Sequence, residues 1–345
     1  MHTHAPVPAS RPAPGGASSS RRFIRELGPA ERLEGAFAIA NAQLGKTKQD
    51  KPFLKCLIGD KTGMLPGRMW SIEPHHFRRL PTDGFVYIEA ETQPYQGELQ
   101  LIIHLIDPIE PAEDQLRELL PCSDQDPETM LAEVRAILAT LQHPAARALA
   151  EAYLADEHLM SALKRCPAAK SMHHACLGGL LEHTLQVMRL ATAVCPLYPR
   201  LSRDLVVLGL FLHDLGKTRE LVYDRTFSYS DRGELIGHIT DGVIMLHDKA
   251  QQVMRATGVR LPANLVMVLQ HIILSHHGLP EFGAAKVPST PEAIMVSLLD
   301  NLDAKTEICL SAARCELGTS ALGGNFTEKH WALDAKLFRP DPLKE

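Results

Sequence analysis

Residues 208–217 read LGLFLHDLGK, an apolar helical stretch that ends in an adjacent histidine and aspartate. Burying such a pair among leucines is unfavourable unless an opposite charge compensates it. Neutral imidazole and carboxylate are also the side chains that bind divalent cations through nitrogen and oxygen. His213 and Asp214 therefore predict a metal centre within a helical domain.

Further histidines and an aspartate lie on other predicted helices. His183 shares one helical face with Leu180 and Val187, so it is aimed inward. Singly, each such residue has an ordinary explanation as a core histidine or a charge at a helix end. Five separate helices that each present an inward histidine or aspartate favour a shared metal site. The predicted ligands are His183, His213, Asp214, His238, His276, His277 and Asp300.

The composition is that of a globular protein of about two domains in 345 residues. A net charge of −5 argues against a protein that coats nucleic acid by bulk attraction. The seven cysteines form no C-x-x-C pair, which favours reduced thiols in a cytosol. No 18-residue apolar run and no signal segment is present, so we expect a cytoplasmic protein without a membrane partner.

The region 30–111 has the period-two pattern of β-strands. The stretch 53–58 places Leu54, Cys56 and Ile58 on one face, and further strands are predicted over 64–70, 85–90 and 98–105. About five short strands and a helix-like stretch near 73–80 predict a small closed barrel of the OB type.

Beyond Pro111 the periodicity becomes helical, with helix starts predicted at Asp126, Pro144 and Pro291. The predicted fold is therefore multidomain, a small β-barrel (OB-fold) followed by an all-α domain. The expected parts are a disordered tail, the barrel, a helical connector, the metal-binding helical domain and a C-terminal extension, over 1–29, 30–111, 112–165, 166–325 and 326–345 respectively.

The predicted ligands resemble the H…HD…D signature of the HD-domain metal-dependent phosphohydrolases, and the extra histidines resemble its two-metal subset. Longer phrases are similar to the bacterial YhaM-type 3′→5′ exoribonucleases, in which an OB fold precedes an HD domain. These phrases lie at 170–174, 178–184, 233–239, 274–283 and 300–305, and the similarity covers roughly 30–325. Residues 284–286, Ala-Ala-Lys, depart from the small residue and proline usual there, which leaves substrate preference open.

Two metals about 4 Å apart can activate a hydroxide between them for attack on a phosphodiester. The resemblance implies release of nucleoside 5′-monophosphates from the 3′ end, with two divalent ions, Mn²⁺ first and Fe²⁺, Co²⁺ or Mg²⁺ as alternatives. By family analogy, His183, His213 and Asp300 hold one ion, and the other histidines hold the second. Asp214 is the predicted bridge, and Lys217 is predicted to stabilise phosphoryl charge.

The barrel is predicted to bind the strand. Between residues 46 and 68 there are six Lys or Arg against two acids, and Phe53 with Lys55 and Arg68 with Trp70 lie off the apolar face of their strands. Aromatic rings beside cations suit single-stranded nucleic acid, RNA ahead of DNA. The predicted contacts are Phe53, Lys55, Arg68, Trp70 and Tyr87, with His173 and His174 placed either at the substrate phosphate or as caps of the His183 helix. Self-association through surfaces such as 126–165 is left open.

Two rival functions remain. The first is a nucleotide or cyclic-dinucleotide phosphodiesterase of the HD superfamily, although the Gly-Tyr-Pro phrase expected of the cyclic-dinucleotide branch is absent. A barrel would also be superfluous for a mononucleotide. The second is a non-catalytic nucleic-acid-binding protein with a degenerate core, against which all seven predicted ligand positions are filled.

Overall fold

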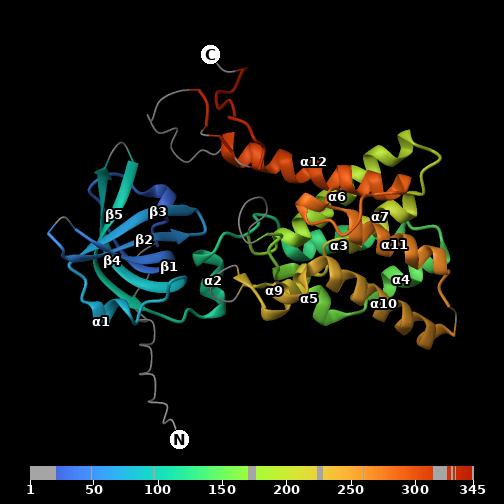
Figure 1. Cartoon of the computed structure of the whole chain (residues 1–345), viewed down its shortest axis with the longest axis horizontal. Coiled ribbons are helices and arrows are strands. Elements are labelled where there is room, and N and C mark those ends of the chain that lie inside the picture. The colour runs from blue at the N-terminus through green and yellow to red at the C-terminus, as the bar shows by residue number, and fades with distance from the viewer. Residues whose placement is uncertain are drawn as a thin grey trace, which may run out of the picture. The chain divides into compact units, whose positions relative to one another are not determined.

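The computed structural model describes residues 21–47, 49–95, 98–169, 176–223, 228–258, 260–313, 325–327, 329–330 and 332–343. It divides into two compact units, with one boundary between Pro121 and Cys122. Figure 1 shows strands in the first unit and helices in the second. The expectation of a small barrel followed by an all-α domain is confirmed. None of the described helices has both the length and the apolar composition needed to span a bilayer.

The strands of the first unit close into a barrel in the order β1-β2-β3-β5-β4. β3 and β5 run parallel where they meet, and the other neighbouring strands are antiparallel. A bulge between Ala40 and Gln43 interrupts the pairing of β1 with β2. The bounds are β1 (Arg32–Lys46), β2 (Pro52–Asp60), β3 (Gly63–Trp70), β4 (Gly84–Tyr95) and β5 (Glu98–Pro108), with the short helices η1 (Ile24–Glu26), α1 (Pro74–Phe77) and α2 (Glu113–Leu119).

Alternation along each strand fills the barrel with apolar side chains. Leu54, Cys56 and Ile58 of β2 are buried, while Lys55 is exposed between them. Gly67 of β3 faces Cys56, and a Cβ there would lie only 2.9 Å from the Cys56 Sγ, so the close approach of these strands needs glycine. Ile24, which precedes the expected barrel boundary at residue 30, is buried in the same core.

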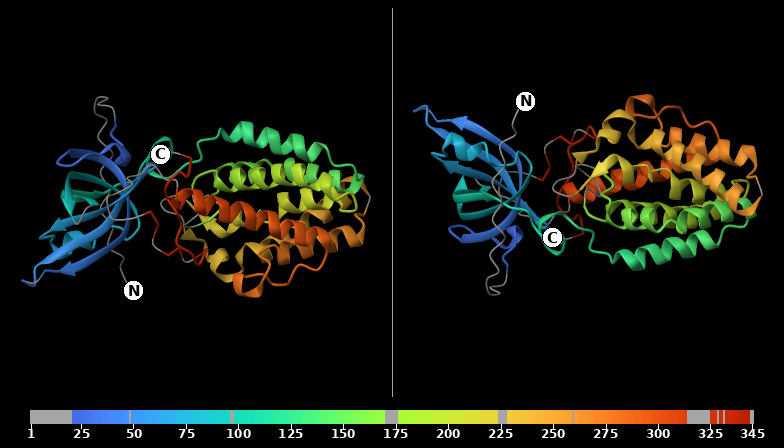
Figure 2. Two further views of the ribbon diagram at one scale, coloured as in Figure 1. Left: turned by 90° about the horizontal axis from the view of Figure 1, so that it is seen from above. Right: turned by 90° about the horizontal axis from the view of Figure 1, so that it is seen from below.

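The second unit is a helical bundle. In both views of Figure 2 its long helices lie side by side with roughly parallel axes. The bounds are α3 (Pro127–Ala139), α4 (Pro144–Leu154), α5 (Glu157–Arg165), α6 (Gly179–Val194), η2 (Cys195–Leu197), α7 (Arg203–Leu212), α8 (Lys217–Glu220), β6 (Leu221–Val222), β7 (Ser228–Tyr229), α9 (Asp231–Leu235), α10 (Gly237–Thr257), α11 (Ala263–Ser275), η3 (Pro280–Phe282) and α12 (Pro291–Ala313).

Helix α7 lies at the centre of this bundle and contacts α6, α11 and α12. Its residues from Val206 to Leu212 are all buried, as expected for a helix that is apolar on most sides. At Gly209 an added Cβ would lie 3.0 Å from Ile272 of α11, so glycine lets the two helices pack closely. The bundle therefore fixes the C-terminal end of α7, which carries His213 and Asp214, deep inside the unit.

Helices α3, α4 and α5 belong to the same hydrophobic core as the helices around α7. Asp126 caps α3 by accepting a hydrogen bond from the Thr129 nitrogen at 2.8 Å, and Pro144 is the first residue of α4. The helix starts predicted at these two residues are thus found.

Candidate metal centre

The seven predicted ligands converge from five helices. His183 and His238 lie near the N-terminal ends of α6 and α10, whereas His213 and His276 cap the C-terminal ends of α7 and α11. Asp300 reaches the same place from the middle of α12. Helix ends and one helix side thus meet around a common point.

One half of the cluster contains His183, His213 and Asp300. The His183 Nε2 lies 3.2 Å from an Asp300 oxygen and 3.4 Å from the His213 Nε2. The Oδ2 of Asp214 lies 3.3 Å from the His213 Nε2 and 3.9 Å from the His183 Nε2. Three nitrogen and oxygen donors, from His183, His213 and Asp214, lie within 4.8 Å of one another.

The other half contains His238, His276 and His277. The second oxygen of Asp214, Oδ1, lies 3.5 Å from the His276 Nε2 and 3.6 Å from the His238 Nε2. His277 completes a group of donor atoms that again lie within 4.8 Å of one another. The two oxygens of Asp214 therefore face different halves, which is the arrangement that a bridging carboxylate requires.

The polar atoms at the centre fit a cation better than they fit one another. Asp214 Oδ1, His238 Nε2 and His276 Nε2 are buried without a hydrogen-bond partner. Leaving such atoms unpaired is costly, and native proteins rarely do so. A divalent ion with nitrogen and oxygen ligands would satisfy all three.

The histidines are oriented for this role by their other ring nitrogen. The Nδ1 atoms of His213, His276 and His277 lie 2.7–2.9 Å from main-chain carbonyl oxygens of Leu210, Ile273 and Phe282 respectively. A carbonyl can only accept, so each Nδ1 carries the proton and donates it. The Nε2 lone pair of each neutral ring is then free to bind a metal.

His183 and His238 are held by carboxylates instead. The Nδ1 of His183 lies 2.7 Å from an Asp303 oxygen, and the Nδ1 of His238 lies 2.9 Å from a Glu220 oxygen. Glu220 also accepts from the His238 main-chain nitrogen. Sequence reasoning assigned no role to either acid, although Asp303 follows Asp300 by one helical turn. Each half of the cluster thus contains one histidine with a carboxylate partner.

Replacing either carboxylate should weaken metal binding. We expect Glu220→Ala or Asp303→Ala to lower the affinity for Mn²⁺ by roughly 10- to 100-fold, because the imidazole loses its orientation and some basicity. Calorimetric titration and metal analysis measure the affinity and the stoichiometry of each variant. Glu234→Ala on α9, an exposed acid, is the matched control. Unchanged stoichiometry and affinity in both variants would show that these acids do not position ligands.

The charged groups of the cluster shift one another's pKa values. Burial alone would lower the pKa of His183, but hydrogen bonds to Asp300 and Asp303 outweigh it and raise the pKa to about 9. Burial and the neighbouring His276 and His238 lower the pKa of His277 to about 3. Burial would raise the pKa of Asp214, yet the ammonium group of Lys217 holds it well below its usual range. At neutral pH the centre therefore offers anionic carboxylates and a neutral His277, with His183 still protonated.

This protonation predicts a pH-dependent metal affinity. Below pH 9 a cation must displace the proton of His183, so Mn²⁺ affinity should rise by about tenfold per pH unit between pH 6.5 and 9. In the metal-free protein, the stability from the raised pKa is fully present below 6.5 and is lost as pH rises through 9. Titration calorimetry at three pH values measures the first effect, and a flat profile would contradict it. Asp303→Asn should make the Mn²⁺ affinity less dependent on pH.

Lys217 follows Asp214 by three residues and contacts it directly. Its Nζ donates to the Asp214 Oδ2 at 2.7 Å, and the charge of Asp214 raises the Lys217 pKa against the effect of burial. Glycine at position 216 allows this turn, since a Cβ there would lie 2.0 Å from the His238 carbonyl oxygen. The chain after Asp214 is thus packed directly against the start of α10.

The predicted strand-binding residues lie mainly on one outer face of the barrel. Phe53 and Trp70 are paired across β2 and β3 with ring centroids 5.2 Å apart, and Lys55 is paired with Arg68. The Phe53 ring covers Gly45 of β1, where a Cβ would lie 2.6 Å from it. These four side chains form a patch that combines two rings with two cations.

Tyr95, which sequence reasoning missed, belongs to this patch. The Arg68 guanidinium lies 5.2 Å from the Tyr95 ring centroid and 5.9 Å from that of Trp70. Trp70 and Tyr95 are both nearly half exposed. Tyr87 has different surroundings, since burial together with the charges of Glu34 and Glu89 raises its pKa. The predicted contacts His173 and His174 lie outside the described residues.

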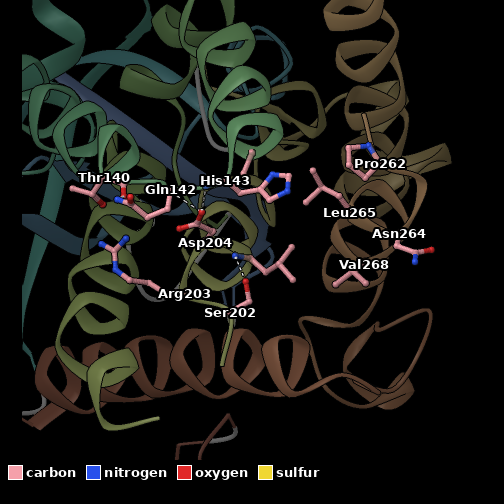
Figure 3. Close-up of a pocket in the computed structure, with 12 residues that line it drawn as sticks. Thr140, Gln142, His143, Ser202, Arg203, Asp204, Pro262, Asn264, Leu265 and Val268 are labelled. Carbon is pink, nitrogen blue, oxygen red and sulfur yellow. Dashed lines mark hydrogen bonds between the residues drawn. The ribbon is translucent and has the colours of Figure 1, made fainter. Parts of the chain in front are cut away.

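A cavity of about 680 Å³ lies at the opposite end of α7 from the cluster. Figure 3 shows that its lining includes His143, Asp204 and Leu265, near the starts of α4, α7 and α11. Asp204 accepts hydrogen bonds from the main-chain nitrogens of Gln142 and His143, so its carboxylate stabilises the turn that precedes α4. Among the described residues, none of the predicted site residues lines this cavity, and the metal-binding chemistry lies elsewhere.

Comparison with known proteins identifies a matching family model and similar curated proteins. The model described as HD domain matches residues 180–305. The 3′-5′ exoribonuclease YhaM of Shouchella clausii (strain KSM-K16) is 33% identical to the chain over 316 residues. That alignment covers 91% of the chain and 95% of the relative. The matched HD segment contains every residue of the cluster described above.

Proposed function

This chain belongs to the family of the 3′-5′ exoribonuclease YhaM, and from that premise we propose that it shortens single-stranded RNA from the 3′ end. The chain is a hydrolase with an HD domain, a domain of metal-dependent phosphohydrolases. The products would be nucleoside 5′-monophosphates. This proposal assigns strand binding to residues 30–111 and hydrolysis to residues 166–325.

The observation that carries the proposal is the position of Asp214. Its two oxygens face two groups of histidines, 3.3 Å from the His213 Nε2 on one side and 3.5 Å from the His276 Nε2 on the other. We infer that Asp214 would serve as a ligand to both of two divalent cations. His183, His213 and Asp300 would hold the first, and His238, His276 and His277 the second.

Two bound cations, for which we propose Mn²⁺, would supply an activated water and neutralise charge on the phosphoryl oxygens. The protein contributes the geometry. Asp303 and Glu220 hold His183 and His238 with the Nε2 atoms turned inward, and main-chain carbonyls do the same for the other histidines. Ligands held in this way would keep the phosphodiester and the attacking group correctly positioned for reaction.

Lys217 would add positive charge at the same point. Its ammonium group contacts the Asp214 Oδ2 and is largely buried, so its field is weakly screened. We propose that Lys217 holds Asp214 ionised and stabilises negative charge that develops on the phosphoryl group. Both residues would then be catalytic, Asp214 as a ligand and Lys217 as an electrostatic partner.

The outer face of the barrel would bind the single-stranded RNA that the cluster hydrolyses. Phe53, Trp70 and Tyr95 offer rings on which bases stack, and Lys55 and Arg68 offer charge to the phosphates. Tyr87 is left out of this proposal because Glu34 and Glu89 make its surroundings acidic.

End-labelled substrates test the proposal directly. Single-stranded RNA, single-stranded DNA and cyclic dinucleotides are incubated with the protein and Mn²⁺, and the products are separated by length. We expect a ladder that shortens one nucleotide at a time from the 3′ end of RNA. Cleavage only of small nucleotides would instead favour an HD-type nucleotide phosphodiesterase. Binding without any cleavage would favour a non-catalytic role.

A further inference from the structure

The His277 side of the cluster carries apolar side chains that are not packed. Phe282 and Leu279, which follow His277, are 68% and 44% exposed. Leu235, which precedes His238 by three residues, is 85% exposed. Scattered exposed leucines are normal on a protein surface, but a large exposed ring next to a buried polar centre is unusual.

The main chain that carries Phe282 is held firmly. The Phe282 nitrogen donates to the Leu279 oxygen at 3.0 Å, and the Gly283 nitrogen donates to the Pro280 oxygen at 2.9 Å. Gly278 and Gly283 enclose this turn with φ values of +80° and +96°, which glycine adopts without strain. The exposed ring therefore projects from an ordered turn whose own fold does not bury it.

The same turn is part of the metal centre. The Phe282 carbonyl oxygen accepts the hydrogen bond from the His277 Nδ1 at 2.9 Å. The His277 ring in turn lies 5.2 Å from that of His238, centroid to centroid. Only one imidazole thus separates the Phe282 main chain from the donor atoms of the cluster, so a nucleotide bound there lies within reach of the ring.

The chemistry of the turn selects a base over a phosphate. Its side chains are three apolar groups, those of Leu279, Pro280 and Phe282, and the exposed carboxylate of Glu281, which would repel a phosphodiester. An uncharged, flat ligand face is what an exposed phenyl ring attracts, and every nucleobase has one. We propose that Phe282, flanked by Leu279, stacks on the base of one of the two nucleotides that flank the scissile phosphate. This inference rests on the proposed function and adds a base-binding subsite to it.

The test compares Phe282→Ala with Phe282→Trp and with Tyr198→Ala, a 55% exposed aromatic beyond the far end of α6. Kinetics are measured on end-labelled RNA that is intact or has an abasic site at either of the two terminal positions. On intact RNA, Phe282→Ala should raise KM roughly 5- to 150-fold with a smaller change in kcat. Phe282→Trp and Tyr198→Ala should resemble the wild type.

The abasic substrates identify the contact. If the ring stacks on a base, removing that base should weaken the wild type, and Phe282→Ala should then cause no further loss. Manganese content and thermal stability should stay at wild-type values, because the carbonyl that holds His277 belongs to the main chain.

Two results would overturn the subsite. One is an unchanged KM of Phe282→Ala on intact RNA, including the case in which the variant instead alters self-association. The other is an equal loss on intact RNA and on both abasic substrates. These results differ from failure of the proposed function, in which the wild type would leave intact RNA unshortened and both proposals would fall.

Discussion

Asp214→Ala is expected to lower the rate of RNA hydrolysis by at least about 10³-fold while single-strand binding by the barrel is retained. The carboxylate faces both halves of the cluster, at 3.3 Å from the His213 Nε2 and 3.5 Å from the His276 Nε2. Its removal also leaves the buried ammonium of Lys217 without its partner. Both proposed ion positions should therefore be weakened at once, which no other ligand substitution would do.

Metal analysis and the RNA ladder on one preparation measure this effect. Asp248→Ala on α10, an exposed aspartate outside the cluster, is the matched control and should keep both ions and full activity. Filter binding of labelled RNA reports on the barrel. Substantial hydrolysis by Asp214→Ala would refute the bridging role, and loss of RNA binding without loss of turnover would refute the division of labour between the two parts.

The double substitution Phe53→Ala and Trp70→Ala should produce the second large effect, on affinity for long RNA. Base–aromatic stacking contributes about 1–3 kcal/mol per base, so two rings give about 2–6 kcal/mol, or roughly 30- to 10⁴-fold in Kd. The rings lie 5.2 Å apart on the outside of the barrel, where neither is needed for its core. Hydrolysis of a dinucleotide should hardly change.

Met64→Ala is the control on the same strand as Trp70, since Met64 is also about half exposed. Fluorescence anisotropy with RNA of increasing length gives the Kd values, and circular dichroism checks the barrel. An equal loss on dinucleotides and on long RNA would argue against strand binding at this face. An unchanged Kd would exclude it.

Much of the fold follows from local pattern. The alternation at 53–58 indicates which side chains enter the barrel, and the N-cap at Asp126 and the proline at 144 mark where helices begin. The first strand was harder to predict from the sequence, since Arg32–Lys46 is rich in Gly and Ala and contains a bulge. Its length depends on pairing with β2 and β4, which no local pattern encodes.

The residues of the site likewise fall into those that local pattern predicts and those that it does not. Residue type and helical spacing are enough to nominate the seven cluster residues, because His and Asp are rare on inward faces. Asp303 and Glu220 were missed because their partners come from other helices, 120 and 18 residues away in the chain. The acids beside Tyr87 likewise depend on strand register, which places Glu34 opposite Glu89.

The carbonyls that hold His213 and His276 have a consequence for how the centre tolerates change. In each case the histidine donates to the residue three positions earlier, at the last turn of its helix, where carbonyls lack an intrahelical partner. The orientation of these rings is therefore determined by the backbone and does not depend on which apolar side chains surround them. Substitution of neighbouring apolar side chains should therefore leave the centre intact. One residue inserted into α7 or α11 would instead rotate the ring by about 100° about the helix axis and abolish metal binding.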